Sequence, residues 1–217
     1  MTLTTWLSLT AVCLLGAMSP GPSLALVMRN TVNHGRAAGL VTAISHGVGV
    51  GIYALATALG LAAIIAAQQA LFTTITLAGA GYLLWLGASA MRAASPDGLE
   101  TPSDPAESAE PAAGNEGHGS RAAIRDGLAM ALLNPKIAVF FLALFSQFVS
   151  ADADAGTVAI LAGTAATVDA AWYALVATGL AASGGAAWLR RRRVWIERLT
   201  GAVLVFLALS TAATVIG

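Results

Sequence analysis

Residues 127–149 read GLAMALLNPKIAVFFLALFSQFV, an apolar stretch that is interrupted once, at Asn134-Pro135-Lys136. A helix rises about 1.5 Å per residue, so about 20 residues cross the roughly 30 Å hydrocarbon core of a bilayer. The stretch is therefore long enough to cross a membrane as a helix. Proline removes a backbone donor and clashes with the preceding turn, so we expect this helix to break at Pro135.

Five other apolar stretches of similar length favour an all-α, polytopic membrane protein with six transmembrane helices. The six predicted spans are Trp6–Met28, Leu40–Ala66, Leu71–Met91, Gly127–Val149, Thr157–Ser183 and Val194–Ile216. Composition agrees, because only 10% of the residues are charged and the mean hydropathy is +0.76. Soluble domains carry roughly 25% charged residues, so this chain has too little charge to cover a soluble surface.

Residues 93–120, between the third and fourth spans, have a different composition. They include four of the 7 prolines of the chain and many Gly, Ser and Glu residues. Such a stretch buries too little apolar surface to offset its ordering entropy, so we expect a flexible cytoplasmic loop. The loop divides a single membrane domain, 1–217, into two three-helix halves, 1–92 and 121–217. Halves with three helices each enter the membrane from opposite sides, which is the topology of an inverted repeat.

The arginines predict the orientation of the chain. All of them fall in or beside the first, third and fifth connections between spans, and none lies near the termini or in the second and fourth connections. The positive-inside rule then places the arginine-rich connections in the cytoplasm and both termini outside it. We therefore expect a multi-pass protein of the plasma (inner) membrane. A net charge of zero argues against nucleic acid as a partner.

The first span is interrupted in the same way as the fourth, by Ser19-Pro20-Gly21-Pro22. Broken backbone at membrane depth is tolerated where it is buried in protein or lines a water-filled cavity. Ser19 suits the N-cap of a restarting helix and Pro20 its first position, and Asn134-Pro135 repeats this arrangement. Each restart would present free N–H groups and the positive end of a helix dipole, which attract a carboxylate. The alternative, that both prolines are packing kinks, stays open.

Polar side chains inside the spans are the next candidates. Lys136 and Asp169 are the only charged residues deep in the predicted spans, where a charge costs at least a few kcal/mol unless it faces the interior and pairs. They either form a structural ion pair or line a transport path, with Asp169 binding a substrate ammonium group or carrying a proton. His46 is a second candidate for proton coupling, or else a hydrogen-bonded core residue. Trp172 shares the face of Asp169 and is either a pocket wall or a core aromatic.

Small residues recur at four-residue spacing on two spans, which allows close helix contact. The second span carries Gly39, Ala43, Gly47 and Gly51, and the fifth carries Ala159, Gly163, Thr167 and Ala171. These stripes would permit a homodimer without requiring one.

Several of these motifs together resemble the LysE (lysine exporter) family of amino-acid exporters. They are Ser19-Pro20-Gly21-Pro22, His34-Gly35-Arg36-Ala37-Ala38-Gly39-Leu40, and Asn134-Pro135-Lys136 followed by Phe140-Phe141. The resemblance covers nearly the whole chain. It implies efflux of amino acids or related small molecules, driven by proton exchange or the membrane potential. The family includes a basic amino-acid branch and an RhtB-like branch for homoserine and threonine.

The sequence thus predicts a secondary active exporter of small zwitterionic solutes, without enzymatic activity, cofactor or metal. The expected substrate-binding residues are Ser19, Pro20, Gly21, Pro22, Asn134, Pro135, Lys136, Asp169 and Trp172, and the expected proton-coupling residues are Asp169 and His46. Because Asp169 is the one carboxylate deep in the spans, neutral amino acids are favoured. The alternatives are an intramembrane enzyme and a metal or redox transporter. Neither has a matching motif, such as His-Glu-x-x-His or Gly-x-Ser-x-Gly, and Cys13 is the lone cysteine.

Overall fold

The computed structural model describes residues 1–19, 21–93, 120–149, 153–181 and 185–216, and every element in them is a helix. The elements are α1 (Leu3–Met18), α2 (Pro22–Ala67), α3 (Gln69–Ala93), α4 (Ser120–Leu133), α5 (Pro135–Phe145), α6 (Ala155–Ala181) and α7 (Gly185–Ile216). In the described residues, 4 helices are long and apolar enough to cross a membrane, and α4 with α5, bent by 55°, makes a fifth span when the two are counted together. The predicted all-helical, polytopic membrane architecture is confirmed. The expected loop over 93–120 lies, apart from its end residues, outside the described residues.

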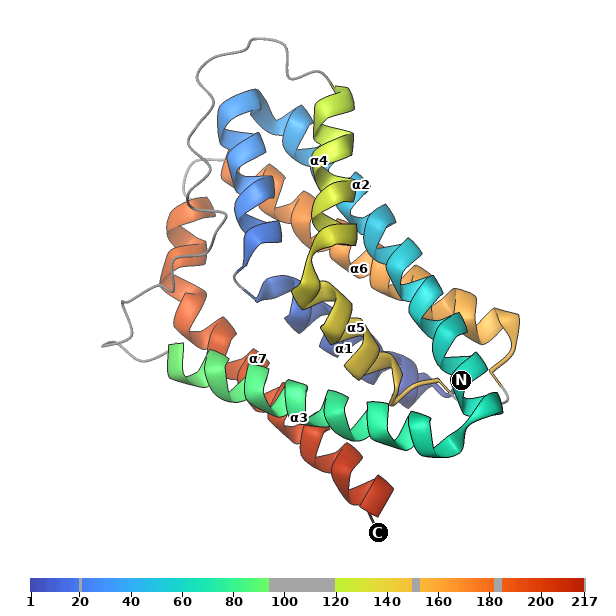
Figure 1. Cartoon of the computed structure of the whole chain (residues 1–217). Coiled ribbons are helices and arrows are strands. Elements are labelled where there is room, and N and C mark those ends of the chain that lie inside the picture. Colours follow the sequence, from blue (N-terminus) through green and yellow to red (C-terminus); the bar gives the residue numbers. More distant parts are fainter. Residues whose placement is uncertain (20, 94–119, 150–152, 182–184, 217) are drawn as a thin grey trace.

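Helix α2 is a hairpin, because the chain reverses at Gly35 (Figure 1). Gly35 has φ 82° and ψ 169°, a region of backbone space that is accessible almost only to glycine. The first arm, residues 22–34, approaches this turn, and the second arm, residues 36–67, leads away from it. Asn30 Nδ2 donates a hydrogen bond to Thr42 Oγ1 at 2.9 Å, which ties the two arms together beside the turn.

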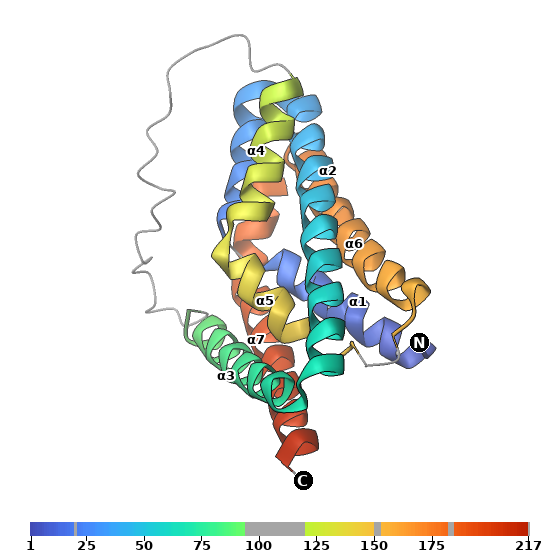
Figure 2. The ribbon, with the colours of Figure 1, turned by 45° about the vertical axis from the view of Figure 1, so that its right-hand side comes forward.

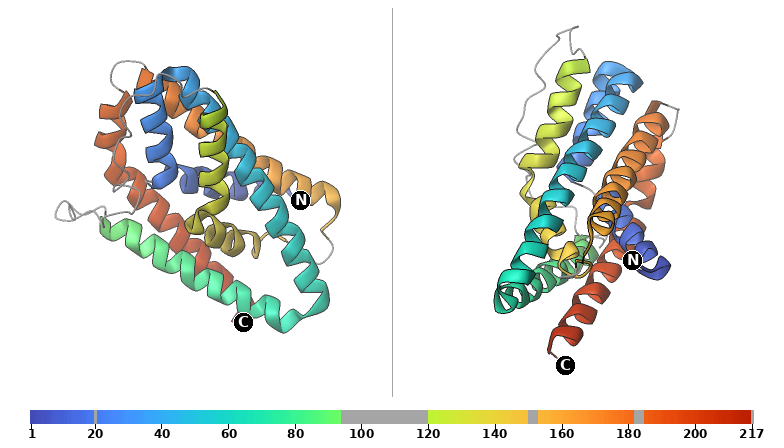
Figure 3. Two further views of the ribbon diagram at one scale, coloured as in Figure 1. Left: turned by 45° about the horizontal axis from the view of Figure 1, so that its top comes forward. Right: turned by 90° about the vertical axis from the view of Figure 1, so that its right-hand side faces the viewer.

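The second arm of α2 lies between α4 and α6 (Figures 2 and 3). Glycines allow both approaches. A Cβ atom on Gly47 would lie 2.6 Å from Ala170 Cβ on α6, and one on Gly127 of α4 would overlap the Ser45 hydroxyl. The predicted small-residue stripe of the second span is therefore used for packing within the chain. In the stripe predicted on the fifth span, all four residues are exposed on the outside of α6.

Helices α3 and α7 pack against each other along the edge of the molecule (Figure 1). Their closest approach is reciprocal: a Cβ on Gly87 would lie 2.7 Å from the Gly201 carbonyl oxygen, and a Cβ on Gly201 would lie 2.6 Å from the Gly87 carbonyl oxygen. A larger residue at either position would force the two helices apart.

The exterior of the fold is apolar, unlike that of a soluble protein, and several polar side chains lie inside. His46 and Thr42 are 0% exposed in the interior, whereas Val48 and Ile52, on the opposite face of the same α2 arm, are each 51% exposed. Such an arrangement is stable where the surroundings are hydrocarbon, because apolar side chains then gain nothing from burial and polar groups gain partners inside. The outer surface is therefore suited to lipid contact.

The connections between helices fall on two opposite sides of the molecule (Figure 1). The Gly35 turn, the ends of α3 and α6 and the starts of α4 and α7 lie on one side, and both termini lie on the other. On the Gly35 side, Arg29 lies 3.8 Å from Asp126, which also contacts Arg125 at 3.2 Å. On the terminal side, Asp154 precedes α6, and hydrogen bonding from Thr157 holds the pKa of the Asp154 carboxyl below its usual range.

Candidate functional site

The first predicted helix break separates α1 from α2, but the restart differs in register from the prediction. Ser19 ends α1, with its N–H bonded to carbonyls of that helix, and Gly21 is the N-cap of α2. The residue before a proline is disfavoured in the helical region, so Ser19 and Gly21, each preceding a proline, are both extended. The helix can therefore restart only at Pro22, and the expectation that Ser19 caps the new helix is wrong. Pro20 lies outside the described residues.

The second break follows the prediction closely. Asn134 is the N-cap of α5, its side-chain oxygen accepts a hydrogen bond from the Lys136 N–H at 3.0 Å, and Pro135 occupies the first helical position. Proline fits there because its missing N–H would have no helical partner. The bend of 55° between α4 and α5 turns the new helix away from the old axis.

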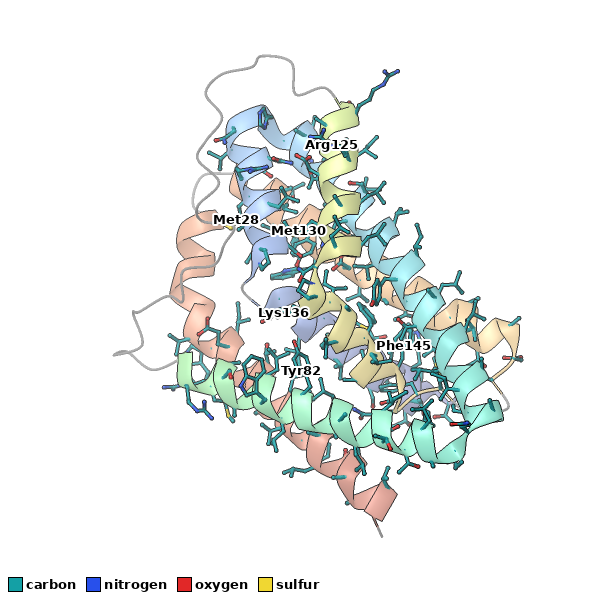
Figure 4. All side chains as sticks on the ribbon, in the orientation of Figure 1. Met28, Tyr82, Arg125, Met130, Lys136 and Phe145 are labelled. Carbon is teal, nitrogen blue, oxygen red and sulfur yellow. The ribbon has the colours of Figure 1, made fainter. Side chains whose placement is uncertain are left out.

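The two breaks are joined by side-chain hydrogen bonds. Lys136 Nζ donates to Ser19 Oγ at 3.3 Å, and Asn134 Nδ2 donates to Ser23 Oγ at 3.4 Å. Lys136 lies near the middle of the molecule, whereas Arg125 points outward at the Gly35 side (Figure 4). The two breaks, far apart in the sequence, therefore form one polar centre.

His46 and Asp169 form a tight pair beside this centre. His46 Nδ1 lies 2.6 Å from Asp169 Oδ2, and His46 Nε2 lies 3.0 Å from Ser23 Oγ. All three side chains are buried, and the Tyr173 ring packs edge-on against the imidazole with a centroid distance of 5.1 Å. Ser23 thus connects the His46–Asp169 pair to Asn134 at the second break.

All of these groups line one cavity of about 60 Å³, well above the roughly 10–15 Å³ that one water molecule needs. Its polar wall consists of Ser19, Gly21, Pro22, Ser23, His46, Asn134, Lys136, Asp169, Tyr173 and Thr200. The cavity as a whole is lined by residues of α1, α2, α3, α5, α6 and α7. In this conformation the cavity is sized for water, so a larger solute requires side chains or helices to move apart.

Six of the nine residues predicted to bind substrate lie on this wall: Ser19, Gly21, Pro22, Asn134, Lys136 and Asp169. Pro20 lies outside the described residues, and Pro135 and Trp172 do not line the cavity. Trp172 is buried against Leu24 and Val27 of α2, and Tyr173 lines the cavity in its place. On a helix, a residue four positions on lies about 40° from the first, and one three positions on lies about 60° away. Tyr173 is therefore better aligned with Asp169 than Trp172 is.

Ser23, Tyr173 and Thr200 were not predicted for the site. Ser23 follows the Ser-Pro-Gly-Pro motif directly, so its position in the first turn of a restarted helix was the available signal. Tyr173 could have been found from its four-residue spacing to Asp169. Thr200 reaches the site through the packing of α7 on α1, where its hydroxyl donates to the Leu15 carbonyl at 3.4 Å.

Comparison with known proteins relates this arrangement to a family. Residues 14–214 match the model of the LysE type translocator family. The chain belongs to the LysE family. The sequence-based resemblance is confirmed, and LysE family members are transporters rather than enzymes.

Three relatives show how this LysE family chain compares with named proteins. It is 30% identical over 201 residues to the threonine efflux protein of Escherichia coli, covering 91% of this chain and 92% of the relative. It is 29% identical over 149 residues to a homoserine/homoserine lactone efflux protein of Salmonella typhimurium (69% and 66% covered). It is 31% identical over 134 residues to a leucine efflux protein of Klebsiella pneumoniae (62% and 58% covered). No solved structure matches the chain.

Proposed function

We propose that this protein is a secondary active exporter that carries neutral amino acids out of the cytoplasm in exchange for protons. One observation carries the proposal: a single interior cavity holds Lys136, both helix breaks and the His46–Asp169 pair. The names of the relatives, which act on threonine, homoserine and leucine, support amino acids of this class.

The two charges of an amino acid have complementary partners on the polar wall. Its carboxylate would lie between Lys136 and the start of α2, where Gly21 offers no side chain to cap the first-turn N–H groups. A Cβ on Gly21 would lie 3.5 Å from Lys136 Nζ. The Lys136 ammonium group and the first-turn N–H groups of α2 are therefore close enough to bind one anion together. The ammonium group would bind the Asp169 carboxylate, which is the opposite charge on this wall.

The His46–Asp169 pair supplies a reason for proton exchange. A protonated His46 forms an ion pair with Asp169, and a substrate ammonium group needs the same carboxylate. Two cations beside one buried carboxylate repel each other, so substrate binding favours release of the proton from His46. Proton and substrate therefore compete for one site, which is the requirement for exchange of one for the other across the membrane.

The proposed membrane topology has six crossings in two halves of opposite orientation. The hairpin at Gly35 divides α2 into the end of a first crossing and a complete second one, and α4 with α5 forms the fourth. Equivalent helices of the two halves pack together: the second arm of α2 with α6, and α3 with α7. The reciprocal contact of Gly87 and Gly201 supports an inverted repeat, because reciprocal contacts are typical of a two-fold axis.

The proposed orientation places the Gly35 turn in the cytoplasm and both termini outside, as the arginines predict. Arg29, Arg125 and Asp126 then lie at the cytoplasmic side of the cavity. A homodimer stays a sequence-based prediction. The exposed stripe on α6, which includes Gly163, is where a second copy would approach most closely, because a Cβ on Gly163 would meet no described atom within 4 Å.

The proposal is tested with purified protein in liposomes that are loaded with labelled leucine or threonine and contain a pH-sensitive dye. We expect efflux that becomes faster when the outer medium is made acidic and that acidifies the lumen. Asp169→Asn should abolish efflux, and Lys136→Met should slow it at least about tenfold, as expected for loss of a charge-assisted contact of about 1.4 kcal/mol or more.

His46→Gln separates substrate transport from proton coupling. Glutamine can still donate a hydrogen bond to Asp169 but does not titrate, so exchange of labelled for unlabelled substrate should persist while the pH dependence is lost. Each variant is first checked for a monodisperse gel-filtration profile. Unchanged efflux in both folded Asp169→Asn and folded Lys136→Met would show that these residues are structural and that the proposed site is wrong.

A further inference from the structure

The cavity has a polar layer and an apolar layer, and the function proposed above gives no role to the apolar one. Three helices each contribute a polar residue to the wall and, four residues away, an apolar one: His46 and Val50 on α2, Lys136 and Phe140 on α5, and Asp169 and Ala165 on α6. Four residues correspond to about one helical turn, or 6 Å. The polar layer is therefore followed by an apolar layer along the cavity.

All three helices place the apolar layer on the same side. The second arm of α2 and α5 run away from the Gly35 side, so Val50 and Phe140 lie beyond His46 and Lys136 in that direction (Figure 1). Helix α6 runs the opposite way, so Ala165, which precedes Asp169, lies on that side too. The apolar layer faces the side that carries both termini.

We infer that this apolar layer is the subsite for the substrate side chain and that it selects neutral amino acids with apolar, branched side chains. The inference rests on the proposed function and adds a substrate class to it. With the ammonium and carboxylate groups held in the polar layer, the side chain of a bound amino acid extends into the layer of Val50, Phe140 and Ala165. Lys136 and Asp169 would already be bound to the substrate carboxylate and ammonium groups, so a lysine or glutamate side chain would place a further charge among the apolar residues of this layer. Such burial is strongly unfavourable.

Gly16 and Phe140 set the depth of this subsite. Both line the cavity, and a Cβ on Gly16 would lie 2.8 Å from Phe140 Cζ and 3.2 Å from Cε1. The Phe140 ring therefore lies directly on the α1 backbone, where an added Cβ would displace it. Rotation of this one side chain would enlarge the cavity for a substrate. Its size and its freedom to move should therefore determine which side chains fit.

The test uses proteoliposomes loaded with an equimolar mixture of glycine, alanine, valine, leucine, threonine, phenylalanine, lysine and glutamate, with efflux of each followed by mass spectrometry. We expect valine and leucine to leave at least about tenfold faster than glycine, since one methylene in an apolar pocket is worth about tenfold or more. Threonine should leave more slowly than valine, by up to about a hundredfold, which is the discrimination an apolar pocket achieves against an isostere with an added hydroxyl. Lysine and glutamate should stay inside.

Two variants should change this order in opposite directions. Gly16→Ala narrows the subsite, so leucine efflux should fall at least about tenfold relative to alanine efflux. Phe140→Leu widens it, so phenylalanine efflux should rise at least severalfold relative to valine efflux. Phe145→Leu is the matched control: Phe140 and Phe145 both pack edge-on against Phe141, at 5.4 and 5.3 Å, but Phe145 does not line the cavity.

The outcomes separate this inference from the exporter itself. Efflux of amino acids without preference for apolar side chains would overturn the subsite and leave the exporter in place. The same follows if Phe140→Leu and Phe145→Leu change selectivity equally, or if Gly16→Ala slows all substrates in proportion. A folded wild-type protein that releases no amino acid would overturn both proposals.

Discussion

The direction of the hydrogen bond between Ser23 and His46 depends on the charge of His46. A serine hydroxyl has one donor and two acceptor positions, and neutral imidazole has one of each. While His46 is neutral and donates to Asp169, its Nε2 accepts from Ser23; once His46 is protonated, Nε2 becomes a donor and Ser23 must accept. Protonation of His46 thus reverses this hydrogen bond and frees the Ser23 hydrogen to bond another acceptor.

Ser23→Ala should therefore uncouple the site as well as destabilise it. Loss of the hydroxyl leaves His46 Nε2 and Asn134 Nδ2 without this partner in a buried setting, which costs about 1–3 kcal/mol of unfolding free energy. We also expect the pH profile of efflux to shift, because the imidazole loses its hydrogen-bond partner. Thermal unfolding and efflux between pH 5 and 8, a range of about the usual histidine titration, measure the two effects.

Ser45→Ala is the control for this prediction. Ser45 is also buried, but its hydroxyl donates to the backbone carbonyls of Thr42 and Ala123, away from His46. It should lower stability without moving the pH profile. If Ser23→Ala keeps the wild-type profile as well, Ser23 has only a packing role.

At the scale of whole elements, the hairpin in α2 depends on one backbone conformation. The two arms form a continuous run of helix in sequence, and Gly35 alone has non-helical dihedral angles within it. Its position brings Ser23 on one arm and His46 on the other to the same depth, where they bond. The turn therefore positions two members of the polar wall, Ser23 and His46, relative to each other.

Gly35→Ala should destabilise the protein by about 1–3 kcal/mol, the cost of holding a residue with a Cβ in this region. Space is not the reason, because a Cβ at Gly35 would meet no described atom within 4 Å. Gly60→Ala is the matched control in the same element: it also has open space, but its backbone is helical, so alanine should stabilise by up to about 1 kcal/mol. Thermal unfolding in detergent measures both. Equal effects of the two substitutions would contradict the strained-turn explanation.

At the scale of the whole molecule, the two sides differ in charge and should face different compartments. Cysteine introduced at Thr2, near the N-terminus, should react with a membrane-impermeant maleimide added to intact cells. Cysteine introduced at Asn33, beside the Gly35 turn, should react only after the membrane is permeabilised. Both positions are exposed, so accessibility to the reagent depends on the compartment. The wild-type protein is the control, since its Cys13 is buried and should stay unlabelled. Labelling of Asn33→Cys in intact cells would show that the Gly35 side faces outward, which is the opposite of the proposed orientation.

Several features of the fold and site followed from the sequence alone because their causes act within a few residues. The length of an apolar run determines whether it can cross a bilayer, and Pro135 after Asn134 determines both the break and its cap. A charge in hydrocarbon is energetically unfavourable, and this alone predicted that Lys136 and Asp169 face the interior. Even the wrong restart after Ser19 has a local cause, since each of the two prolines restricts the residue before it.

Only the tertiary structure determined which groups meet. Asp169 pairs with His46, which is 123 positions away in the sequence, and Ser23 joins that pair to Asn134. These contacts depend on how each helix is rotated about its own axis and on the depth at which it packs. Those variables are set by distant close approaches, such as Gly47 against α6 and Gly16 beneath Phe140. Hydrophobic length and proline rules contain no information about rotation, so the cavity and its two layers became visible only once the helices were packed together.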